Sequence, residues 1–381
     1  MKKILLLGAS GSIGTQCIDV IKAHPDSLKL VGASVGHNVD YLRDILKQFK
    51  LEYAYTIHPC NDLVRQYPDT RFYYGDEGLL KIAKEEGYDT LVNALVGFAG
   101  FRPTVEAIKC HKNIALANKE TLVGGGDIIM PLVKEYGVKL YPIDSEHSAI
   151  WQCLNGHERK DVRRLVITGS GGSFRDKSRN ELANVSVEDA LKHPNWAMGA
   201  KITIDSATMM NKGFEVMEAH YLFDIPYDNI DVILHSQSII HSMVEYNDGS
   251  IIAQMGCPDM RLPIKYALLY PEHLKDENTN YLDVDSLFEL NFKKMDYQRY
   301  PLVRLAKEIG KFGGNFGAIL IGANDEAVDL FLKGRIAFID IEKYIFKALK
   351  SAHFIAKPTI DEIISSHNWA RAYVADMWAN S

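Results

Sequence analysis

The sequence predicts an α/β fold with an N-terminal doubly wound parallel sheet, a central α+β domain and a C-terminal helical bundle. Roughly the first 140 residues alternate short aliphatic runs with segments whose apolar residues recur at helical spacing. After that region strand patterns separated by short turns appear, and the last part of the chain is purely helical in pattern. We expect domains at 1–143, 144–270 and 299–381, with a polar linker at 271–298.

The N-terminal domain carries six aliphatic runs of strand length. Between the first two runs, Ile13, Cys17, Val20 and Ile21 are spaced for one face of a helix. Regular alternation of strands and helices predicts a Rossmann-like parallel sheet. The predicted strands are Lys3–Leu7, Leu28–Ser34, Tyr53–Ile57, Thr90–Leu95, Asn113–Ala117 and Val138–Ile143.

The rest of the chain predicts a second sheet and then a bundle. Asn247-Asp248-Gly249 is a hairpin signal between two strand patterns. The predicted strands of the central domain are Arg164–Thr168, Lys201–Ile204, Ile230–His235, Ile239–Tyr246 and Ser250–Met255. The predicted helices of the bundle are Tyr300–Lys311, Phe316–Lys333, Asp340–Ala352 and Thr359–Ala379.

Composition narrows the class of protein. The 381 residues suffice for two or three cores, and a net charge of −6 gives no reason to expect nucleic acid as a partner. Five scattered cysteines without a CxxC pair indicate free thiols in a reducing compartment. The apolar run from Ile4 ends at Gly8, too early for a signal peptide, and no apolar stretch approaches the ~20 residues of a membrane span. We therefore expect a soluble, cytoplasmic protein without a membrane partner.

A glycine loop, Gly8-Ala-Ser-Gly11-Ser-Ile-Gly14, follows the first strand and opens the first helix. Glycines at this point allow a tight turn and close approach of the backbone to a pyrophosphate, which the helix N-terminus stabilises. A glycine-rich turn in another kind of α/β protein is the alternative. The position within a βαβ unit favours a dinucleotide site.

The end of the second predicted strand favours NADPH over NADH. Proteins that bind NAD usually place Asp or Glu there to accept a hydrogen bond from the ribose 2′-hydroxyl. The segment Leu30–Asn38 contains no acid, and His37 and Asn38 are suited to a 2′-phosphate.

Two carboxylates, Asp144 and Glu146, follow the last predicted strand of the N-terminal sheet. If they continue that strand, a spacing of two residues places both on one face. Carboxylates at the carboxyl end of a parallel strand suit a hard divalent cation. A solvated acidic loop or a helix cap is the alternative interpretation.

The segment Lys201–Glu218 adds polar groups of a different kind. We expect a strand to end near Ser206 and a helix to begin near Thr208, so that Asn211 and Glu215 share a helical face. Ser206, Asn211 and Lys212 would then form an anion site at the helix N-terminus, with Glu215 as a third metal ligand. The simpler reading of Met209, Met210, Phe214 and Met217 is that they are core residues, and Glu218 suits a surface or packing carboxylate equally well.

Two loops are rich in polar or aromatic side chains. Thr168–Ser173 offers hydroxyls and backbone amides of the kind that bind phosphate. His193–Gly199 carries Trp196 between predicted elements, which is typical of a lid that excludes water from a site.

Together these segments resemble the 1-deoxy-D-xylulose 5-phosphate reductoisomerase family. The Asp-Ser-Glu-His and Asp-Ser-Ala-Thr-Met-Met-Asn-Lys-Gly runs are the most specific matches, and the C-terminal helices match only in general pattern. Matching stretches, in the family's order, are Gly8–Gly14, Ala117–Glu120, Asp144–His147, Thr168–Gly172, His193–Gly199, Lys201–Glu218, His241–Tyr246 and Pro258–Arg261.

The resemblance implies a role for each matching residue. Asp144, Glu146 and Glu215 would bind Mg²⁺ or Mn²⁺, with Co²⁺ as a further candidate, and act with Lys119 in catalysis. Substrate would contact Lys119, Ser145, Glu146, Ser170, His193, Trp196, Ser206, Asn211, Lys212, Glu215 and His241, with Met198 beside the lid tryptophan. NADPH would contact Ser10, Gly11, Ser12, Ile13, Gly36, His37, Asn38, Asn118, Glu120, Gly199 and Met260.

The family reaction rearranges a 1-deoxyketose phosphate to a branched aldehyde and reduces it to 2-C-methyl-D-erythritol 4-phosphate, and the family implies a homodimer. Ser236 and Ser173 stand where the family usually has Pro, and Ile321–Glu326 differs from its usual Asn-Ala-Ala-Asn-Glu. A homoserine- or semialdehyde-type dehydrogenase is the main alternative, although a semialdehyde dehydrogenase needs a nucleophilic cysteine and no cysteine here stands in such a motif. A catalytically idle NADP-binding sensor is the other.

Overall fold

The computed structural model describes residues 1–286 and 289–380, which group into two compact units. The first unit comprises residues 1–121, 129–148 and 259–280, and the second comprises 122–128, 149–258 and the described part of 281–381. This grouping divides the chain at other places than the three predicted domains, so those boundaries stay a prediction. Leu287 and Phe288 of the predicted linker lie outside the described residues.

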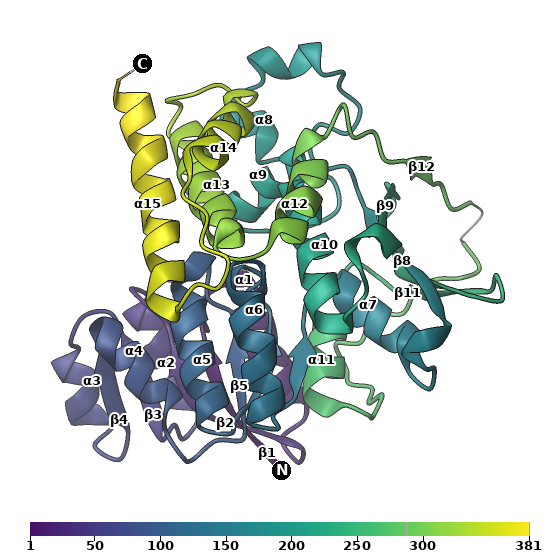
Figure 1. Ribbon diagram of the computed structural model, residues 1–381. Helices are drawn as coiled ribbons and strands as arrows, with labels where there is room; N and C mark the ends of the chain where they lie inside the picture. Colours follow the sequence, from purple (N-terminus) through teal and green to yellow (C-terminus); the bar gives the residue numbers. More distant parts are fainter. Residues whose placement is uncertain (287–288, 381) are drawn as a thin grey trace. The chain divides into compact units, whose positions relative to one another are not determined.

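The first unit is built on a seven-stranded parallel sheet in the order β4-β3-β2-β1-β5-β6-β7 (Figure 1). All six predicted strands are confirmed, with small differences at their ends. The central strands are fully buried because helices cover both faces, which explains their unbroken aliphatic runs. The strands are β1 (Lys2–Leu7), β2 (Leu28–Ser34), β3 (Tyr53–Thr56), β4 (Arg71–Tyr74), β5 (Thr90–Asn93), β6 (Asn113–Leu116) and β7 (Leu140–Pro142).

Strand β4 was not predicted from the sequence. Its four residues, Arg-Phe-Tyr-Tyr, are half-buried or exposed and lie at the edge of the sheet, next to β3 alone among the described strands. An edge strand lacks the aliphatic run that marks a central strand, so the pattern gave no signal.

The direction of strand addition reverses between β1 and β5, which both flank the start of the glycine loop. Crevices at such a reversal, outside the carboxyl ends of the strands, are where open α/β sheets bind ligands. Helices α1 and α11 contribute buried side chains to one core on the sheet, among them Cys17, Ile21 and Ile264. The helices of this unit are α1 (Ser12–Ala23), α2 (Val39–Gln48), α3 (Asn61–Gln66), α4 (Gly75–Ala83), α5 (Phe101–Lys109) and α11 (Arg261–Leu269).

The second unit contains a mixed five-stranded sheet in the order β11-β10-β8-β9-β12. The predicted hairpin is confirmed: Asn247-Asp248-Gly249 joins two antiparallel strands, and Gly249 has the positive φ of +86° that this turn requires. The strands are β8 (Val162–Gly169), β9 (Ile230–Leu234), β10 (Ile240–Tyr246), β11 (Ile251–Met255) and β12 (Lys293–Lys294).

The strand predicted at Lys201–Ile204 is wrong, because these residues belong to helix α9 (Ala200–Thr208). Alternating β-branched residues produced the strand pattern. In the structure Lys201 and Asp205 lie one helical turn apart and form an ion pair of 3.0 Å, while Ile204 and Ala207 are buried. Packing of this kind outweighs weak local strand propensity.

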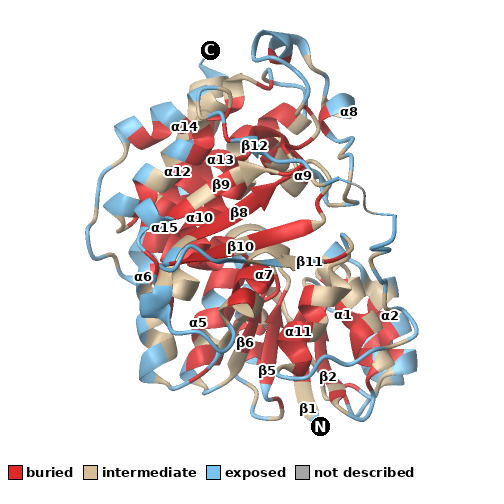
Figure 2. Ribbon diagram, turned by 90° about the vertical axis from the view of Figure 1, so that its right-hand side faces the viewer, coloured by how far each residue is buried: buried red, intermediate tan, exposed pale blue. Residues whose placement is uncertain are grey.

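The four predicted C-terminal helices are confirmed as α12 (Pro301–Phe312), α13 (Phe316–Leu332), α14 (Asp340–Ser351) and α15 (Ile360–Ala379). Helix α13 is buried along most of its length and contacts the other three, whereas the outer faces of α14 and α15 are exposed (Figure 2). The predicted fold class is confirmed. The remaining helices are α6 (Glu120–Glu135), α7 (Ser145–Leu154), α8 (Val187–Ala190) and α10 (Met210–Phe223).

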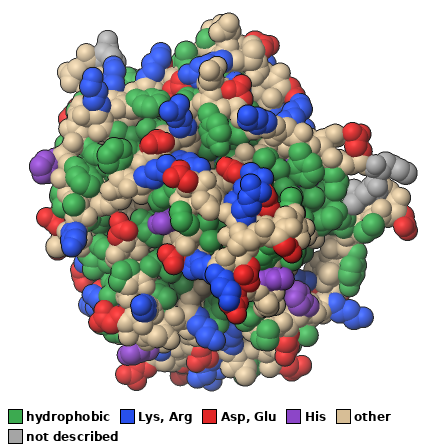
Figure 3. Space-filling model, turned by 45° about the vertical axis from the view of Figure 1, so that its right-hand side comes forward, with side chains coloured by type: hydrophobic (Ala, Val, Ile, Leu, Met, Phe, Trp, Pro, Cys, Tyr) green, Lys and Arg blue, Asp and Glu red, His purple; other side chains and the backbone are tan. Residues whose placement is uncertain are grey.

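The surface drawn in Figure 3 mixes Lys and Arg side chains with Asp and Glu side chains. On that face no large patch of one charge is formed by the described residues. None of the described helices has both the length and the apolar composition required to cross a membrane.

Candidate active site

The glycine loop turns sharply between β1 and α1. Gly8 has a φ of +83°, and a Cβ atom built there would lie 2.4 Å from the carbonyl oxygen of Ala94, so only glycine fits. Gly11 caps α1, and Ser12 and Ile13 form its first turn, which contains no acidic residue. Ser10 donates a 3.2 Å hydrogen bond from Oγ to the carbonyl of Val35, which ties the loop to the end of β2. The loop therefore has the backbone shape of a pyrophosphate site.

The segment after β2 carries exposed polar side chains and no acid. Gly36 has a φ of +61°, and His37 and Asn38 are exposed. The Asn38 side chain caps α2 by accepting a 3.1 Å hydrogen bond from the amide of Tyr41. The carboxylate that NAD-binding proteins use here is absent from residues 34–38.

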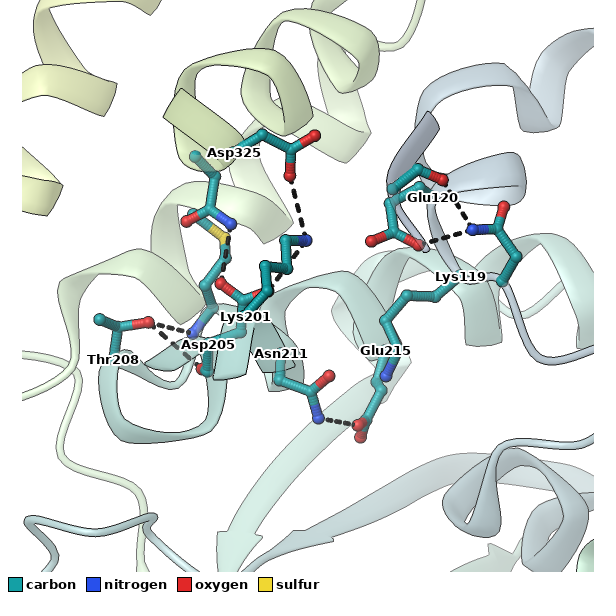
Figure 4. Close-up of polar contacts among 12 residues, drawn as sticks. Lys119, Glu120, Lys201, Asp205, Thr208, Asn211, Glu215 and Asp325 are labelled. Atoms are coloured by element: carbon teal, nitrogen blue, oxygen red, sulfur yellow. Dashed lines mark hydrogen bonds and ion pairs between the residues drawn. The ribbon is translucent and has the colours of Figure 1, made fainter. Parts of the chain in front are cut away.

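Asn118 and Glu120 follow β6 and are buried. Nδ2 of Asn118 donates to the carbonyl oxygens of Leu95 and Gly97 and, at 3.0 Å, to the carboxylate of Glu120. Its side chain thus holds the segment after β5 in place, and its partner Glu120 is labelled in Figure 4. We infer that Asn118 acts by positioning the backbone of this region.

Asp144 and Glu146 lie at the start of helix α7 and do not continue strand β7, which ends at Pro142. The condition for the two-residue strand spacing is therefore not met, and the helix-cap alternative describes Asp144. The carboxylate of Asp144 accepts the backbone amide of Glu146 at 3.2 Å, as a helix-capping residue does. The first turn of a helix is a favourable place for negatively charged side chains, so this position suits both carboxylates.

Lys119 forms a close ion pair with Asp144. Nζ lies 2.9 Å from Oδ2, and both side chains are largely buried. Ser145 donates a 2.6 Å hydrogen bond to Glu146, and the ring of His147 lies 3.7 Å from Asp144. The first unit therefore brings together one cation, one hydroxyl and two carboxylates that the sequence had singled out.

In the second unit, Ser170 and His193 meet. Oγ of Ser170 lies 3.2 Å from Nε2 of His193. Nδ1 of the same ring accepts the backbone amides of Asn195 and Trp196 at 3.2 and 3.0 Å. Since Nδ1 is an acceptor, the neutral ring carries its proton on Nε2 and presents a donor beside Ser170.

His193 is held neutral. Burial, with the positive charges of Arg175 and Lys212 adding to it, lowers the pKa of the ring from 6.5 to about 4. Sequence reasoning did not single out Arg175, which also donates a 2.9 Å hydrogen bond to the carbonyl of Ser236. A ring that two cations surround is suited to bind an anion as a neutral donor.

The glycine-rich loop at the end of β8 packs closely on the last turn of α9 and on Lys212 of α10. Gly172 has a φ of +70°, and a Cβ atom there would lie 2.5 Å from the carbonyl oxygen of Ser206. A Cβ atom on Gly169 would lie 3.2 Å from Cε of Lys212. The loop therefore brings Ser170 into one neighbourhood with Ser206 and Lys212, as predicted for a phosphate site.

Helix α10 presents three of the predicted residues on one face. The amide of Asn211 donates a hydrogen bond to the carboxylate of Glu215, as Figure 4 shows, and Nζ of Lys212 lies 2.6 Å from the same carboxylate. Glu215 is 1% exposed. The predicted shared helical face of Asn211 and Glu215 is confirmed, whereas Ser206 lies within helix α9 and not at the end of a strand.

A buried charged network next to these residues was missed. The carboxylate of Asp205 accepts a 2.8 Å hydrogen bond from Asn324 and pairs with Lys201 at 3.0 Å. Lys201 also lies 3.1 Å from Asp325, to which it points in Figure 4. Burial raises the pKa of Asp205, partly offset by Lys201, whereas Lys201 and His367 outweigh burial and lower the pKa of Asp325. Reading Lys201–Thr208 as a helix would have revealed the first pair.

The predicted lid residues lie between α8 and α9. Trp196 is half-buried rather than exposed, and its ring centroid lies 6.2 Å from that of His241, which is buried on β10. Gly199 is exposed and caps α9, and in the first unit Met260 precedes α11 and packs on the sheet core.

Comparison with known proteins supports the family resemblance of the sequence motifs along nearly the whole chain. Models for domains of 1-deoxy-D-xylulose 5-phosphate reductoisomerase match residues 4–126, 140–223 and 255–373. The chain is 50% identical over 381 residues to 1-deoxy-D-xylulose 5-phosphate reductoisomerase of Exiguobacterium sibiricum, covering 99% of both chains. It is 50% identical over 379 residues to 1-deoxy-D-xylulose 5-phosphate reductoisomerase 2 of Bacillus thuringiensis subsp. konkukian, covering 99% of this chain and all of that one.

Solved structures agree. A 1-deoxy-D-xylulose 5-phosphate reductoisomerase from Zymomonas mobilis in complex with NADPH is 39% identical, with a TM-score of 0.90 and 99% of both chains covered. A DOX-P reductoisomerase in complex with NADPH, fosmidomycin and magnesium is 37% identical, with a TM-score of 0.93, covering all of this chain and 98% of that one.

Proposed function

The chain belongs to the 1-deoxy-D-xylulose 5-phosphate reductoisomerase family. We propose a role for each of its site residues in the reaction of that family. It is an NADP-dependent oxidoreductase that converts 1-deoxy-D-xylulose 5-phosphate in isoprenoid biosynthesis, using NADPH and a divalent metal ion. We propose 2-C-methyl-D-erythritol 4-phosphate as the product. The observation that carries the assignment of roles is the pair of polar groups described above, one around Asp144 and one around Lys212.

The first unit binds the reductant. The Gly8–Gly14 loop would receive the pyrophosphate, because its backbone shape excludes a side chain at Gly8 and α1 presents free amides without a competing acid. The acid-free segment Gly36–Asn38 would face the adenosine ribose. Glu120 and Met260 of this unit are further proposed NADPH contacts, and Gly199, which belongs to the second unit, is another.

Asp144, Glu146 and Glu215 are the proposed metal ligands. The three side chains are carboxylates, the donors that Mg²⁺ and Mn²⁺ prefer. Two of them lie beside a lysine, Asp144 beside Lys119 and Glu215 beside Lys212. When bound, the ion supplies a Lewis acid for the substrate's vicinal oxygens. Magnesium is bound by the structural relative, and Mn²⁺ as an alternative is our proposal.

The second unit holds the substrate phosphate. Ser170, Ser206, Asn211 and Lys212 would donate to it, and the neutral His193 would donate from Nε2. Binding energy from a phosphate remote from the reacting carbons orients the substrate. The aldehyde formed by rearrangement would thereby stay beside the nicotinamide until it is reduced.

Lys119 and Ser145 would contact the substrate's carbonyl and hydroxyl region. The ammonium of Lys119 lies beside Asp144, one of the proposed metal ligands. In that position it can stabilise the oxyanion charge that develops during carbon–carbon bond cleavage. Trp196, with Met198 beside it and His241 behind it, would close over the substrate and exclude water from the reactive intermediate.

A homodimer is proposed, with strand β11 as the contact. Among the described strands β11 pairs only with β10, so its outer edge has open backbone groups. Its exposed face is apolar, with Ile251 and Met255 exposed by 55% and 41%. An apolar edge strand is a template for pairing with a second copy. An Ile251→Lys variant would sediment as a monomer if this is correct.

We also propose a reducing, cytoplasmic location, which the five free cysteines support.

The proposed reaction is tested by NADPH oxidation with 1-deoxy-D-xylulose 5-phosphate, with and without Mg²⁺ or Mn²⁺. We expect turnover only when both substrate and metal are present, and the branched polyol phosphate as product. Full activity after exhaustive chelation would refute the three-carboxylate site. Oxidation of homoserine with NADP⁺ in place of this reaction would instead favour the dehydrogenase alternative.

A further inference from the structure

Two imidazoles lie together at the carboxyl ends of β2 and β3. The ring centroids of His37 and His58 are 5.8 Å apart and the rings are tilted by 51°. Both residues are exposed, and both belong to the first unit. The sequence singled out His37 but gave no role to His58, which follows a strand in another part of the chain.

The backbones that carry the two rings are fixed to each other. The amide of Ile57 donates a 3.0 Å hydrogen bond to the carbonyl of Gly36, and the amide of Val35 donates to Tyr55 at 3.2 Å. The hydroxyl of Thr56 donates a 2.7 Å hydrogen bond to the carbonyl of His58. The pair is therefore held by the sheet, while the rings themselves face solvent.

This pair of histidines lies where a Rossmann-like sheet binds the adenosine ribose, whose 2′-phosphate distinguishes NADPH from NADH. In Rossmann-like sheets the residues after the second strand meet the 2′ position of the adenosine ribose. Strand β3 is the neighbour of β2 on that side, with Ser34 opposite Tyr55. His58, just after β3, therefore lies beside the segment after β2 that would contact the ribose.

The two segments that carry the rings have no strongly basic side chain. Residues 35–38 and 57–60 contain no Lys or Arg. Arg43, on α2, is paired with Asp62 at 2.7 Å and lies 4.0 Å from Asp40. Besides the side-chain amide of Asn38, the imidazole N–H groups of His37 and His58 are therefore the side-chain donors that these two segments offer to a phosphate.

We propose that His58 is a second binding residue for the 2′-phosphate of NADPH, which would be held between the rings of His37 and His58. The proposal rests on the NADPH site proposed above and deepens it by naming a specificity residue. A phosphate monoester carries several acceptor oxygens, so it can accept from both rings at once. NADH lacks this group and gains nothing from His58.

The test is the Michaelis constant for NADPH and for NADH, measured with 1-deoxy-D-xylulose 5-phosphate and Mg²⁺ in the wild type and in His58→Asn. We expect the KM for NADPH to rise about tenfold and the KM for NADH to stay unchanged, since one hydrogen bond to a charged group is lost. His58→Lys should keep most of the NADPH preference. The control is His353→Asn, an exposed histidine of the second unit, which should change neither constant.

Equal changes for NADPH and NADH in His58→Asn, or no change for either, would refute the proposal. Direct titration of the protein with NADPH and NADH, followed by nicotinamide fluorescence, tests the same split without turnover. A wild type that fails to oxidise NADPH with this substrate would refute the proposed function, while the titration would still decide the role of His58.

Discussion

Nε2 of His193 lies 3.2 Å from Oγ of Ser170, and this contact joins the lid segment to the glycine-rich loop after β8. The other ring nitrogen accepts the amides of Asn195 and Trp196. The side chain of His193 thus contacts Ser170 of the proposed phosphate site and also holds the backbone of Trp196, the proposed lid residue. We infer that phosphate binding and lid position are linked through this ring.

The depressed pKa of His193 predicts an acid-sensitive fold. Between pH 6.5 and about 4 the unfolded chain binds a proton at this ring that the folded chain does not, so the free energy of unfolding falls as pH falls through this window. After allowance for solvent screening of a half-buried group, we expect His193 to contribute about 1 kcal/mol of this loss. Urea unfolding at pH 7 and pH 5 measures it. His193→Gln should lose less stability than the wild type, whereas the exposed His353→Gln should not differ; identical losses in all three would contradict the prediction.

Lys212→Ala should weaken substrate binding selectively. Loss of the cation that we propose to contact the phosphate would remove a charge-assisted hydrogen bond, which predicts a rise of about tenfold or more in the KM for 1-deoxy-D-xylulose 5-phosphate. The KM for NADPH should remain within twofold. Lys192→Ala removes an exposed lysine of the same unit, paired with Asp189 at 3.2 Å, and is the matched control. A larger effect on NADPH than on substrate would argue against the phosphate assignment.

Glu215→Gln should abolish most turnover while NADPH binding survives. The substitution keeps the size of the side chain but removes the negative charge proposed for metal binding, so we expect kcat to fall by about two orders of magnitude or more. NADPH affinity is measured by nicotinamide fluorescence in the same preparation. Because Lys212 would lose its partner, circular dichroism must show that the variant is folded. Normal turnover with a collapsed NADPH affinity would show that the metal assignment is wrong.

Lys201→Met should destabilise the protein strongly. It removes the cation that lies 3.0 Å from Asp205 and 3.1 Å from Asp325, leaving two buried carboxylates without it. Breaking a buried ion pair on one side costs about 3–5 kcal/mol. The control is Lys333→Met, which removes the exposed partner of Asp329 at the same helical spacing and should cost less than about 0.5 kcal/mol. Similar unfolding midpoints for the two variants would refute this role for the network.

The first sheet was predictable because its information is local. The buried parallel strands are short, mostly apolar runs, and the glycine loop stands directly after the first of them, so six of the seven strands and the loop follow from short windows of sequence. Strand β4 and helix α9 were not predictable in this way. The first is an edge strand without an apolar run, and the second has a strand-like pattern that packing overrides.

The sequence by itself determined which residues we propose for the chemistry, from the acid-free end of β2 to the Asp-Ser-Glu-His and Met-Met-Asn-Lys-Gly runs. Tertiary structure alone decided their partners: Lys119 beside Asp144, Ser170 beside His193, His58 beside His37 and Lys201 between two aspartates. Motifs are read along the chain, whereas pKa shifts and ion pairs depend on groups that only packing brings within a few ångströms. No local sequence pattern encodes the distance in space between residues far apart in the chain, so the partners of these side chains could be identified only from the tertiary structure.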